Sequence, residues 1–307
     1  MPISFNPTAP LVVVVGSTGN QGGSVIKALT ESDRPYRIRG LTRDATRPVA
    51  QRLTTQGVEV VNVSLTIENA DAVTAAFAGA SIAFIVTNFW EHRNREREVA
   101  EGKMMVKAAM DARVSLVVWS TLESISQISN GKYTHVDHFE GKAEVTAYAR
   151  QLGCPLLTVQ AGAYSTNHMQ WKPFMQKRQE DGSYVLDFGL FVRGGIESPA
   201  LGVGAEILTC GEEISVGEMA AQLSHITGKK VTYKRITDEE FMAATEAPYE
   251  VALELLEMMK FFDEFGYYAG KGTKPSREYL SRVPQTWGEF VRENDWSSVL
   301  ACMIAIQ

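Results

Sequence analysis

Cysteines are scarce in this chain, and long apolar runs and a signal-like start are missing. Its 307 residues include three cysteines, Cys154, Cys210 and Cys302, which are widely separated and odd in number. That usage argues against a disulfide framework and favours a reduced compartment. No apolar run is long enough to cross a bilayer, and residues 1–10 lack the charged and apolar segments of a secretory signal. We therefore expect a cytoplasmic protein, with the nucleus as a second location, and no membrane partner.

An excess of positive charge is also missing. The chain carries 30 Lys and Arg against 36 Asp and Glu, which gives a formal net charge of -6. Because nucleic-acid affinity is built on Lys and Arg that neutralise phosphates, we expect no nucleic-acid partner. The mixed-sign run EHRNREREVAEGK at 91–103 predicts a solvated helix face rather than a phosphate-binding patch. Hydrophobic residues make up 45% of the chain, which is typical of a folded globular protein.

Strand-like apolar runs alternate with helical patterns over the first half of the chain. The runs that predict strands lie at 11–15, 36–42, 58–63, 81–87, 115–120 and 155–162. The helical patterns between them supply the long crossovers that parallel strands need. We therefore predict an α/β fold, with a doubly wound parallel Rossmann sheet over residues 1–162.

The remaining residues, 163–307, predict a smaller C-terminal α+β region that holds a substrate or a partner. Two capping-box patterns, Ser215 with Glu218 and Thr237 with Glu240, mark the starts of helices. The stretch KKVTYKRI at 229–236 predicts a strand, and the stretch at 249–268 is amphipathic.

Glycines cluster where the first predicted strand meets the first helix, in LVVVVGSTGNQGGSV. Gly16 permits a tight turn, Gly19 has no Cβ to block a pyrophosphate, and Gly22 lets the helix pack close to the strand. The helix N-terminus adds unpaired N–H groups and a positive dipole end. A purely structural turn is the alternative, but the position between the first strand and the first helix favours a dinucleotide site.

The end of the second predicted strand bears on which dinucleotide binds. An NAD site usually has an acidic residue there, whereas an NADP site accommodates the 2′-phosphate with arginine. The stretch GLTRDATR places Arg43 at the strand end and Arg47 soon after it, and guanidinium groups pair well with phosphate. Two solvated arginines, with Asp44 as an NAD-type acid, are the alternative. We favour NADP(H) as the cofactor.

The chain resembles the NmrA-like family of atypical short-chain dehydrogenases. The motifs that carry the resemblance, in order, are VVVVGSTGNQGGSV, LTRDATR, AFIVTNFWE, HFEGKAEV and VQAGAYSTN. The family includes a fungal nitrogen-repression regulator and a vertebrate NADPH-sensing protein. The resemblance covers residues 10–188 well and 197–307 more loosely. It is specific for the family but not for one activity.

The resemblance implies a set of cofactor contacts. The glycine turn would hold the pyrophosphate, and the ends of the third and fourth strands would contact the adenine and the ribose–nicotinamide side. A later segment would close over the nicotinamide. In that order the residues are Gly16, Ser17, Thr18, Gly19, Asn20, Gln21 and Gly22; Ser64 and Leu65; Thr87, Asn88 and Phe89; and Tyr164, Ser165, Thr166 and Asn167. Arg43 and Arg47 would hold the 2′-phosphate, and Lys142 would reach the nicotinamide ribose. The family commonly has an acidic residue where this chain has Ser64.

One segment departs from the family. After DGSYVLDFG at 181–189 the family usually has another strand and the start of a helix, whereas here Phe188 and Gly189 run almost directly into LFVRGGIESPALG. We therefore expect part of the wall beside the nicotinamide to be missing near 188–190.

Ordinary short-chain dehydrogenases have a tyrosine four residues before their lysine, and this chain has none four residues before Lys142. That position is His138, which would share a helical face with Lys142, and histidine is a residue type that can pass a proton near neutral pH. Ser120 ends the fifth predicted strand, where those enzymes keep a catalytic serine. We predict Lys142, His138 and Ser120 as catalytic candidates. The alternatives are a polar wall residue at His138, a lysine that only binds the cofactor, and a loop-capping hydroxyl at Ser120. No third ligand accompanies His135 and His138, so we expect no metal site.

Two functions stay open. The first is an NADPH-dependent oxidoreductase that reduces a small carbonyl or imine substrate, with specialised (secondary) metabolism as its setting. The second is a non-catalytic redox sensor that binds NADPH and acts on a regulatory protein partner. The missing tyrosine favours the sensor, whereas the retained lysine permits the enzyme. We lead with the oxidoreductase.

Overall fold

A seven-stranded parallel sheet organises the molecule. The computed structural model describes residues 3–165, 167 and 187–304. The strand order is β3-β2-β1-β4-β5-β6-β7, and each neighbouring pair is parallel. The strands are β1 (Leu11–Val14), β2 (Arg37–Thr42), β3 (Glu59–Asn62), β4 (Ile82–Ile85), β5 (Leu116–Thr121), β6 (Leu156–Gln160) and β7 (Glu206–Leu208). The predicted doubly wound Rossmann sheet is therefore confirmed, and β7 is a strand that the sequence pattern did not reveal.

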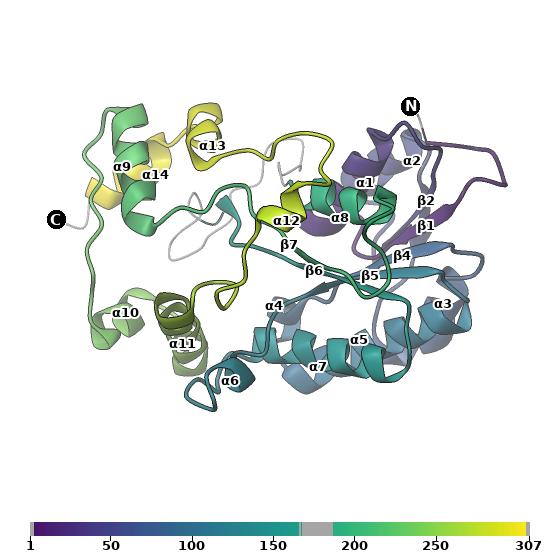
Figure 1. Cartoon of the computed structure of the whole chain (residues 1–307), viewed down its shortest axis with the longest axis horizontal. Helices are drawn as coiled ribbons and strands as arrows, with labels where there is room; N and C mark the ends of the chain where they lie inside the picture. The colour runs from purple at the N-terminus through teal and green to yellow at the C-terminus, as the bar shows by residue number, and fades with distance from the viewer. Residues whose placement is uncertain (1–2, 166, 168–186, 305–307) are drawn as a thin grey trace.

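Helices cover both faces of this sheet (Figure 1). The helices on one face are α1 (Asn20–Thr30), α2 (Pro48–Thr55) and α8 (Phe188–Glu197). Those on the other face are α3 (Ala70–Ala76), α5 (Arg95–Asp111) and α7 (Asp137–Gln151). The short elements η1 (Ile67–Asn69), α4 (Phe89–His92) and α6 (Ile125–Ile128) lie in the connections. Val13 packs into one core and Val12 and Val14 into the other, because successive side chains of a strand point to opposite faces.

The order of the strands creates a crevice position. β1 lies between β2 and β4, so the chain turns in opposite directions from this centre. In such sheets, ligands bind outside the carboxyl ends of the strands at this switch point. The glycine turn leaves β1 at that edge.

Glycine at two positions of the turn is required by the fold itself. Gly16 has a φ of +64°, in the left-handed region that favours glycine. A Cβ on Gly22 would lie 2.3 Å from the carbonyl oxygen of Gly16 and 2.8 Å from that of Val15. Position 22 therefore lets α1 contact the end of β1 backbone to backbone.

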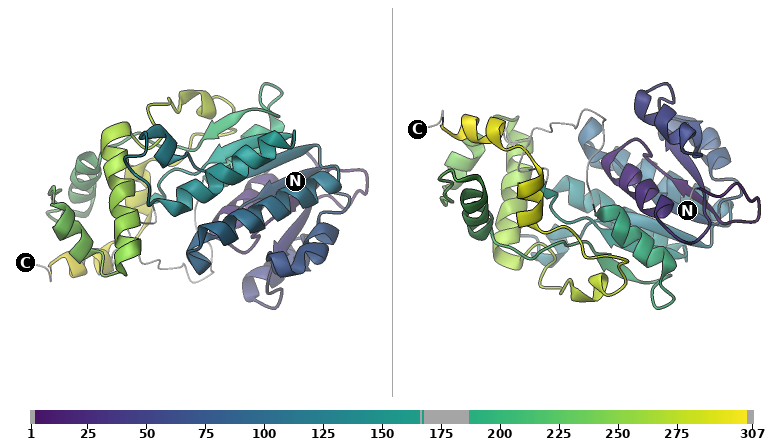
Figure 2. Two further views of the ribbon diagram at one scale, coloured as in Figure 1. Left: turned by 90° about the horizontal axis from the view of Figure 1, so that it is seen from below. Right: turned by 90° about the horizontal axis from the view of Figure 1, so that it is seen from above.

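The C-terminal region lies beyond the carboxyl ends of the strands and is mainly helical (Figures 1 and 2). Its helices are α9 (Val216–Thr227), α10 (Asp238–Ala244), α11 (Tyr249–Phe265), α12 (Lys274–Arg277), α13 (Trp287–Glu293) and α14 (Ser297–Ile304). Both predicted capping boxes are present, at the starts of α9 and α10. A separate apolar core, with Leu223, Trp287 and Trp296 at its centre, joins α9, α13 and α14.

One predicted element of this region is wrong. Residues 229–236 form no strand, and Tyr233 and Ile236 are 56% and 41% exposed. An isolated strand leaves its backbone groups unpaired, and a sequence pattern cannot show whether a neighbouring strand is available. The strand that does follow residue 163 in the described chain, β7, joins the main sheet.

The boundary between 162 and 163 stays a prediction. Both α8 and β7, which follow it, belong to the layers of the Rossmann sheet: α8 packs on α1, and β7 pairs with β6. The family segment expected to be missing near 188–190 falls at the start of α8, next to residues 168–186, which lie outside the described residues. Across the described ranges, no helix has the length and apolarity needed to cross a bilayer.

Gly22→Ala should lower the free energy of unfolding by about 1–3 kcal/mol, the usual cost of overpacking. Its matched control is Gly23→Ala in the same helix, where the added Cβ would lie 3.6 Å from its nearest neighbour, the carbonyl oxygen of Ser17. Gly23→Ala should be neutral or stabilising by up to about 1 kcal/mol, because glycine is a poor helix former. Chemical denaturation measures both. Equal stabilities of the two variants would contradict the tight contact at position 22.

Candidate functional site

The glycine turn leaves the N-terminus of α1 open to a ligand. Gly19 is the N-cap of α1, no side chain caps the helix, and its first turn, which begins at Asn20, carries no acidic residue. The unpaired N–H groups and the positive dipole end are therefore available to an anion. A Cβ on Gly19 would lie 3.2 Å from the carbonyl oxygen of Gly16, which is a tight contact, so position 19 favours glycine.

Two residues of the turn bind the second strand. The backbone N–H and the hydroxyl of Ser17 both donate to the carbonyl of Leu41, each at 3.0 Å. The hydroxyl oxygens of Thr18 and Thr42 lie 3.2 Å apart. These contacts fix the turn against β2. A pyrophosphate contact from Ser17 or Thr18 stays a prediction, and the side chain of Ser17 is already used by the protein.

Gln21 joins the turn to the segment after β6. Its Nε2 donates to the hydroxyl oxygen of Tyr164 at 2.5 Å, and its Oε1 is buried with no partner among the described residues. Burial raises the pKa of Tyr164 to about 12, so its hydroxyl stays protonated. Ser165 follows, and the N–H of Asn167 donates to the carbonyl of Tyr164 at 2.9 Å. The structure thus brings together the glycine turn and the segment after β6, which the family resemblance both assigned to the cofactor. Thr166, also assigned to it, lies outside the described residues.

The arginines after β2 lie at the surface. Arg43 is 62% exposed and forms an ion pair with Glu91 of α4, and Arg47 is the exposed N-cap of α2. Asp44 accepts hydrogen bonds from the backbone and hydroxyl of Thr46 at 2.9 and 2.6 Å, and these bonds hold the pKa of its carboxyl below the usual value. The Asp44 carboxylate is therefore occupied by its own turn, whereas the Arg43 guanidinium is accessible.

The remaining predicted contacts differ in exposure. Ser64 is exposed after β3, and Leu65 packs partly against the core below it. Asn88 donates to Glu91 at 3.2 Å, and Phe89 is buried. The cofactor contacts that the resemblance implies for these four residues stay predictions.

Lys142 lies in a buried polar cluster at the carboxyl edge of β4. Its Nζ donates to the hydroxyl of Thr87 at 2.9 Å and forms an ion pair with Glu98. The Thr87 hydroxyl in turn donates to Glu98 at 2.7 Å. The Glu98 side chain is 0% exposed, and that of Lys142 is 12% exposed.

Glu98 is a residue that the sequence interpretation missed. The run 91–103 is not a solvated face throughout, because Glu98 and Glu101 are 0% and 8% exposed. A helical register would have identified this: Glu98, Gly102 and Met105 follow the spacing i, i+4, i+7 and are all buried on α5. A carboxylate in a buried stripe indicates a paired charge.

His138 is held by an acid from the C-terminal region. The backbone N–H and Nδ1 of His138 both lie within hydrogen-bond distance of Glu254 of α11, at 2.9 and 2.5 Å. The pair is buried, and the indole ring of Trp90 lies 5.0 Å from the imidazole. A carboxylate on Nδ1 fixes the tautomer and leaves Nε2 for another partner. The prediction that His138 and Lys142 share a face of α7 is consistent with their spacing, and each is held by its own buried acid.

Ser120 lies on the other side of the sheet. Trp119 and Thr121 contact Thr146 of α7 at 3.0 and 2.7 Å. Because side chains alternate along a strand, Ser120 points away from α7 and Lys142. It is 1% exposed. A catalytic role for Ser120 stays a prediction that this geometry does not support.

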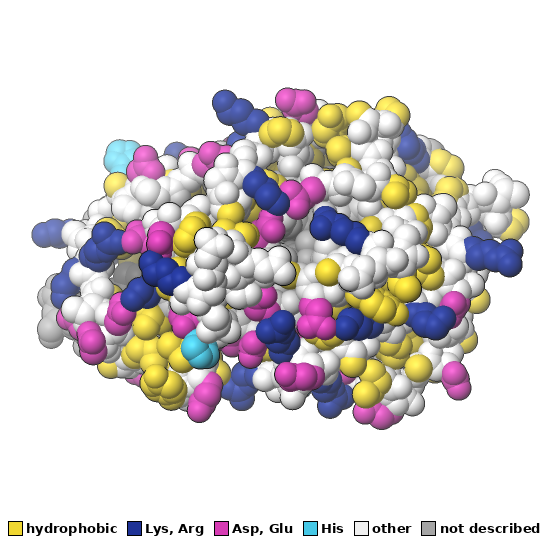
Figure 3. Space-filling view, turned by 60° about the horizontal axis from the view of Figure 1, so that its bottom comes forward, with side chains coloured by type: hydrophobic (Ala, Val, Ile, Leu, Met, Phe, Trp, Pro, Cys, Tyr) yellow, Lys and Arg dark blue, Asp and Glu magenta, His cyan; other side chains and the backbone are white. Residues whose placement is uncertain are grey.

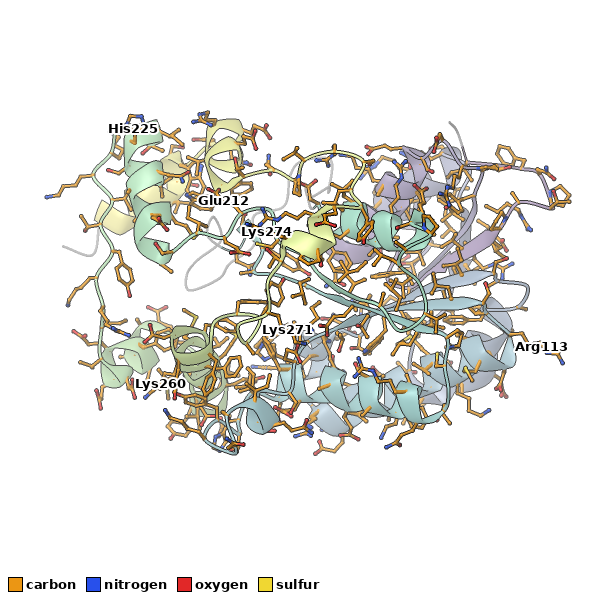
Figure 4. All side chains as sticks on the ribbon, in the orientation of Figure 1. Arg113, Glu212, His225, Lys260, Lys271 and Lys274 are labelled. Atoms are coloured by element: carbon orange, nitrogen blue, oxygen red, sulfur yellow. The ribbon has the colours of Figure 1, made fainter. Side chains whose placement is uncertain are left out.

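Other ion pairs join the C-terminal region to the sheet. Lys271 (Figure 4) pairs with Glu206 at 2.9 Å and with Glu123, and Gln160 donates to both acids. On the face seen in Figure 3, Lys and Arg are interspersed with Asp and Glu, with no patch of one sign. In the parts of the chain that the structure describes, no group of three His, Cys, Asp or Glu side chains is placed to hold a metal ion.

Comparison with known proteins gives a family. A model described as the NmrA-like family matches residues 8–291. A curated relative, the NmrA-like family domain-containing oxidoreductase ptmS of Penicillium ochrochloron, is 26% identical over 298 residues, which cover 86% of this chain and 87% of the relative.

Solved structures share the fold. NmrA, described as a negative transcriptional regulator, superposes with a TM-score of 0.74 at 22% identity, over 94% of this chain and 99% of its own. It has been crystallised with NAD and with NADP. An NADPH-dependent quinone oxidoreductase from Escherichia coli has a TM-score of 0.70 at 18% identity, over 92% and 98% of the two chains.

Glu254→Ala should lower the free energy of unfolding by about 1–3 kcal/mol, because it leaves a buried N–H and a buried imidazole without their acceptor. Glu257→Ala is the matched control one turn along α11. Glu257 makes the same kind of bonds to His135, whose side chain is 57% exposed, so water can replace the lost acceptor. Chemical denaturation should show a smaller loss for Glu257→Ala. A loss as large as that of Glu254→Ala would contradict the role of burial.

Proposed function

The chain belongs to the NmrA-like family, and from this premise we propose that it is an NADP(H)-binding oxidoreductase that reduces a small carbonyl or imine compound. The observation that carries the proposal is the uncapped N-terminus of α1, at the switch point between β1 and β4. The curated relative ptmS is described as an oxidoreductase, and the fold neighbours include NADP complexes.

The residues present fit a dinucleotide phosphate. No acidic side chain lies in the first turn of α1 to repel the pyrophosphate. The buried Oε1 of Gln21, which has no hydrogen-bond partner among the described residues, is an acceptor that a cofactor hydroxyl or amide can satisfy.

The residues after β2 support NADP(H) over NAD(H). Because NmrA has been crystallised with both cofactors, the fold itself does not decide between them. In this chain Arg43 is accessible at the strand end, whereas the Asp44 carboxylate is used by Thr46. The Arg43–Glu91 pair is exposed, and such pairs contribute only about 0–1 kcal/mol, so a phosphate can displace it.

Two residues of α7 would serve the reaction. The bound cofactor supplies a hydride to the substrate. Lys142 would donate to the ribose of the cofactor, and His138, acting as an imidazolium whose Nδ1–H is held by Glu254, would deliver its Nε2 proton to the substrate oxygen or nitrogen and regain a proton from solvent. The spacing i, i+4 places both on one face of α7.

Two further proposals concern the setting of the enzyme and a rival function. We place the enzyme in specialised metabolism and in the cytoplasm. The rival is an NADPH sensor that acts on a protein partner, and it is favoured by the missing tyrosine and by the description of NmrA as a transcriptional regulator.

Arg43→Ala should weaken NADPH binding by about 1.5–3 kcal/mol, the scale of a charge-assisted hydrogen bond, and leave NADH binding unchanged. Arg37→Ala removes the same charge from the opposite end of β2 and should change neither. Titration calorimetry measures the affinities of the wild type and of both variants for NADPH and NADH. Equal affinity of the wild-type protein for NADPH and NADH would overturn the assignment of NADP(H).

The wild-type protein should oxidise NADPH with at least one member of a panel of ketones, quinones and imines, followed by loss of nicotinamide absorbance. His138→Gln should slow that reaction by about 10²-fold, the lower range for general acid catalysis. His225→Gln, at an exposed position on α9 (Figure 4), is the control and should not slow it. NADPH binding without oxidation by any acceptor would favour the sensor instead.

A further inference from the structure

We infer that Glu98 is a positioning residue, whose buried carboxylate holds the ammonium group of Lys142 in the orientation in which Lys142 meets the cofactor. The inference rests on the proposed function, under which Lys142 donates to the ribose. It adds a residue from α5 to a site that the sequence assigned to α7 and the strand ends.

The hydrogen bonds of the cluster have a fixed direction. The Thr87 hydroxyl donates to Oε1 of Glu98 at 2.7 Å, so its oxygen is free to accept from Nζ of Lys142 at 2.9 Å. Lys142 also donates to the same carboxylate oxygen. An ammonium group has three donors, and two are used here. The carbonyl oxygen of Thr87 lies 3.5 Å from Nζ, at the limit for a hydrogen bond, so among the described residues the third donor has only this weak acceptor, which a ligand can replace.

The carboxylate of Glu98 is itself held in place. It lies in the first turn of α5, where the helix dipole favours a negative charge. Its Oε2 faces Gly141, where a Cβ would lie 2.6 Å away, so a side chain at 141 would displace the carboxylate. Glycine at the position before Lys142 thus makes room for Glu98.

In the described part of the chain, the Glu98 side chain forms hydrogen bonds only within this cluster. Within those residues its hydrogen bonds go to Lys142 and Thr87, and its Oε2 has no partner. Two other buried acids hold backbone groups: Glu140 accepts from the N–H of Ser126 at 2.7 Å, and Glu254 accepts from the N–H of His138. Glu98 holds no backbone group, so its effect is exerted on the side chain of Lys142.

Stability alone does not account for this pair. Desolvating two charges costs about as much as their attraction returns, so an apolar pair of similar volume is often as stable. Removing one partner is different, because it leaves an uncompensated charge in the interior. Lys142→Met by itself would therefore leave the Glu98 carboxylate buried without its cation. Any loss of cofactor binding in that variant would combine the loss of the lysine donor with the effect of the unpaired carboxylate. The double variant Glu98→Gln/Lys142→Met separates them.

The test is a double-variant cycle on the full chain, with NADPH as the probe. Lys142→Met should lower Tm by on the order of 10 °C, and Glu98→Gln/Lys142→Met should recover most of that shift. In titration calorimetry below Tm, each single variant should raise the Kd for NADPH about tenfold, and the double variant should raise it no further, because the two residues act as one unit. Glu101→Gln is the matched control, because Glu101 is also buried on α5 but pairs with Arg97 at 2.9 Å. The Kd of this variant for NADPH should equal that of the wild type.

Two outcomes overturn the inference on its own. One is a wild-type Kd for Glu98→Gln, which would leave the acid with a structural role only. The other is a Kd for the double variant equal to the product of the two single losses, which would show that the residues act independently. Failure of the wild-type protein to bind NADPH would instead overturn the proposed function, and this inference with it. Binding without turnover overturns the enzyme alone, because the cycle reads affinity.

Discussion

The structure depends on the contact between α1 and the end of β1. At Gly22 the helix touches the strand backbone to backbone, and a single methyl group would meet the Gly16 carbonyl at 2.3 Å. That contact aims the N-terminus of α1 at the carboxyl edge of the sheet. It does so at the position where β1 separates β2 from β4, so the open helix end, the arginines after β2 and the residues after β4 share one edge.

A second constraint acts on the first turns of α7. This helix carries both His138 and Lys142, and each is fixed by a buried acid from a different part of the chain. Glu98 reaches Lys142 from α5, and Glu254 reaches His138 from α11. Glu254 also accepts from a backbone N–H in the first turn of α7, as a helix cap would. The C-terminal region therefore supplies the contact that orients His138 in the candidate site.

This arrangement gives a chemical meaning to the missing tyrosine. In its place is a histidine whose Nδ1 is occupied by a carboxylate, next to a lysine whose charge is neutralised by another. The cluster places a lysine and a histidine beside two acids in little solvent. Such a site orients donors, and under the proposed function the phosphates would lie at the N-terminus of α1 and at the exposed Arg43.

The sequence by itself determined the alternation of strands and helices, the glycine turn and two helix starts, because each depends on residues close together in the chain. It did not reveal β7, which is three residues long, and it predicted a strand at 229–236 that finds no partner. Only the tertiary structure decided the pairs that hold the site: His138 and Glu254 are 116 positions apart, and Lys142 and Glu98 are 44 apart. In a sequence, an acid within a run of mixed charge is typical of a solvated surface. Whether it is buried depends on which helices pack over it, and so does the face on which Ser120 lies relative to α7.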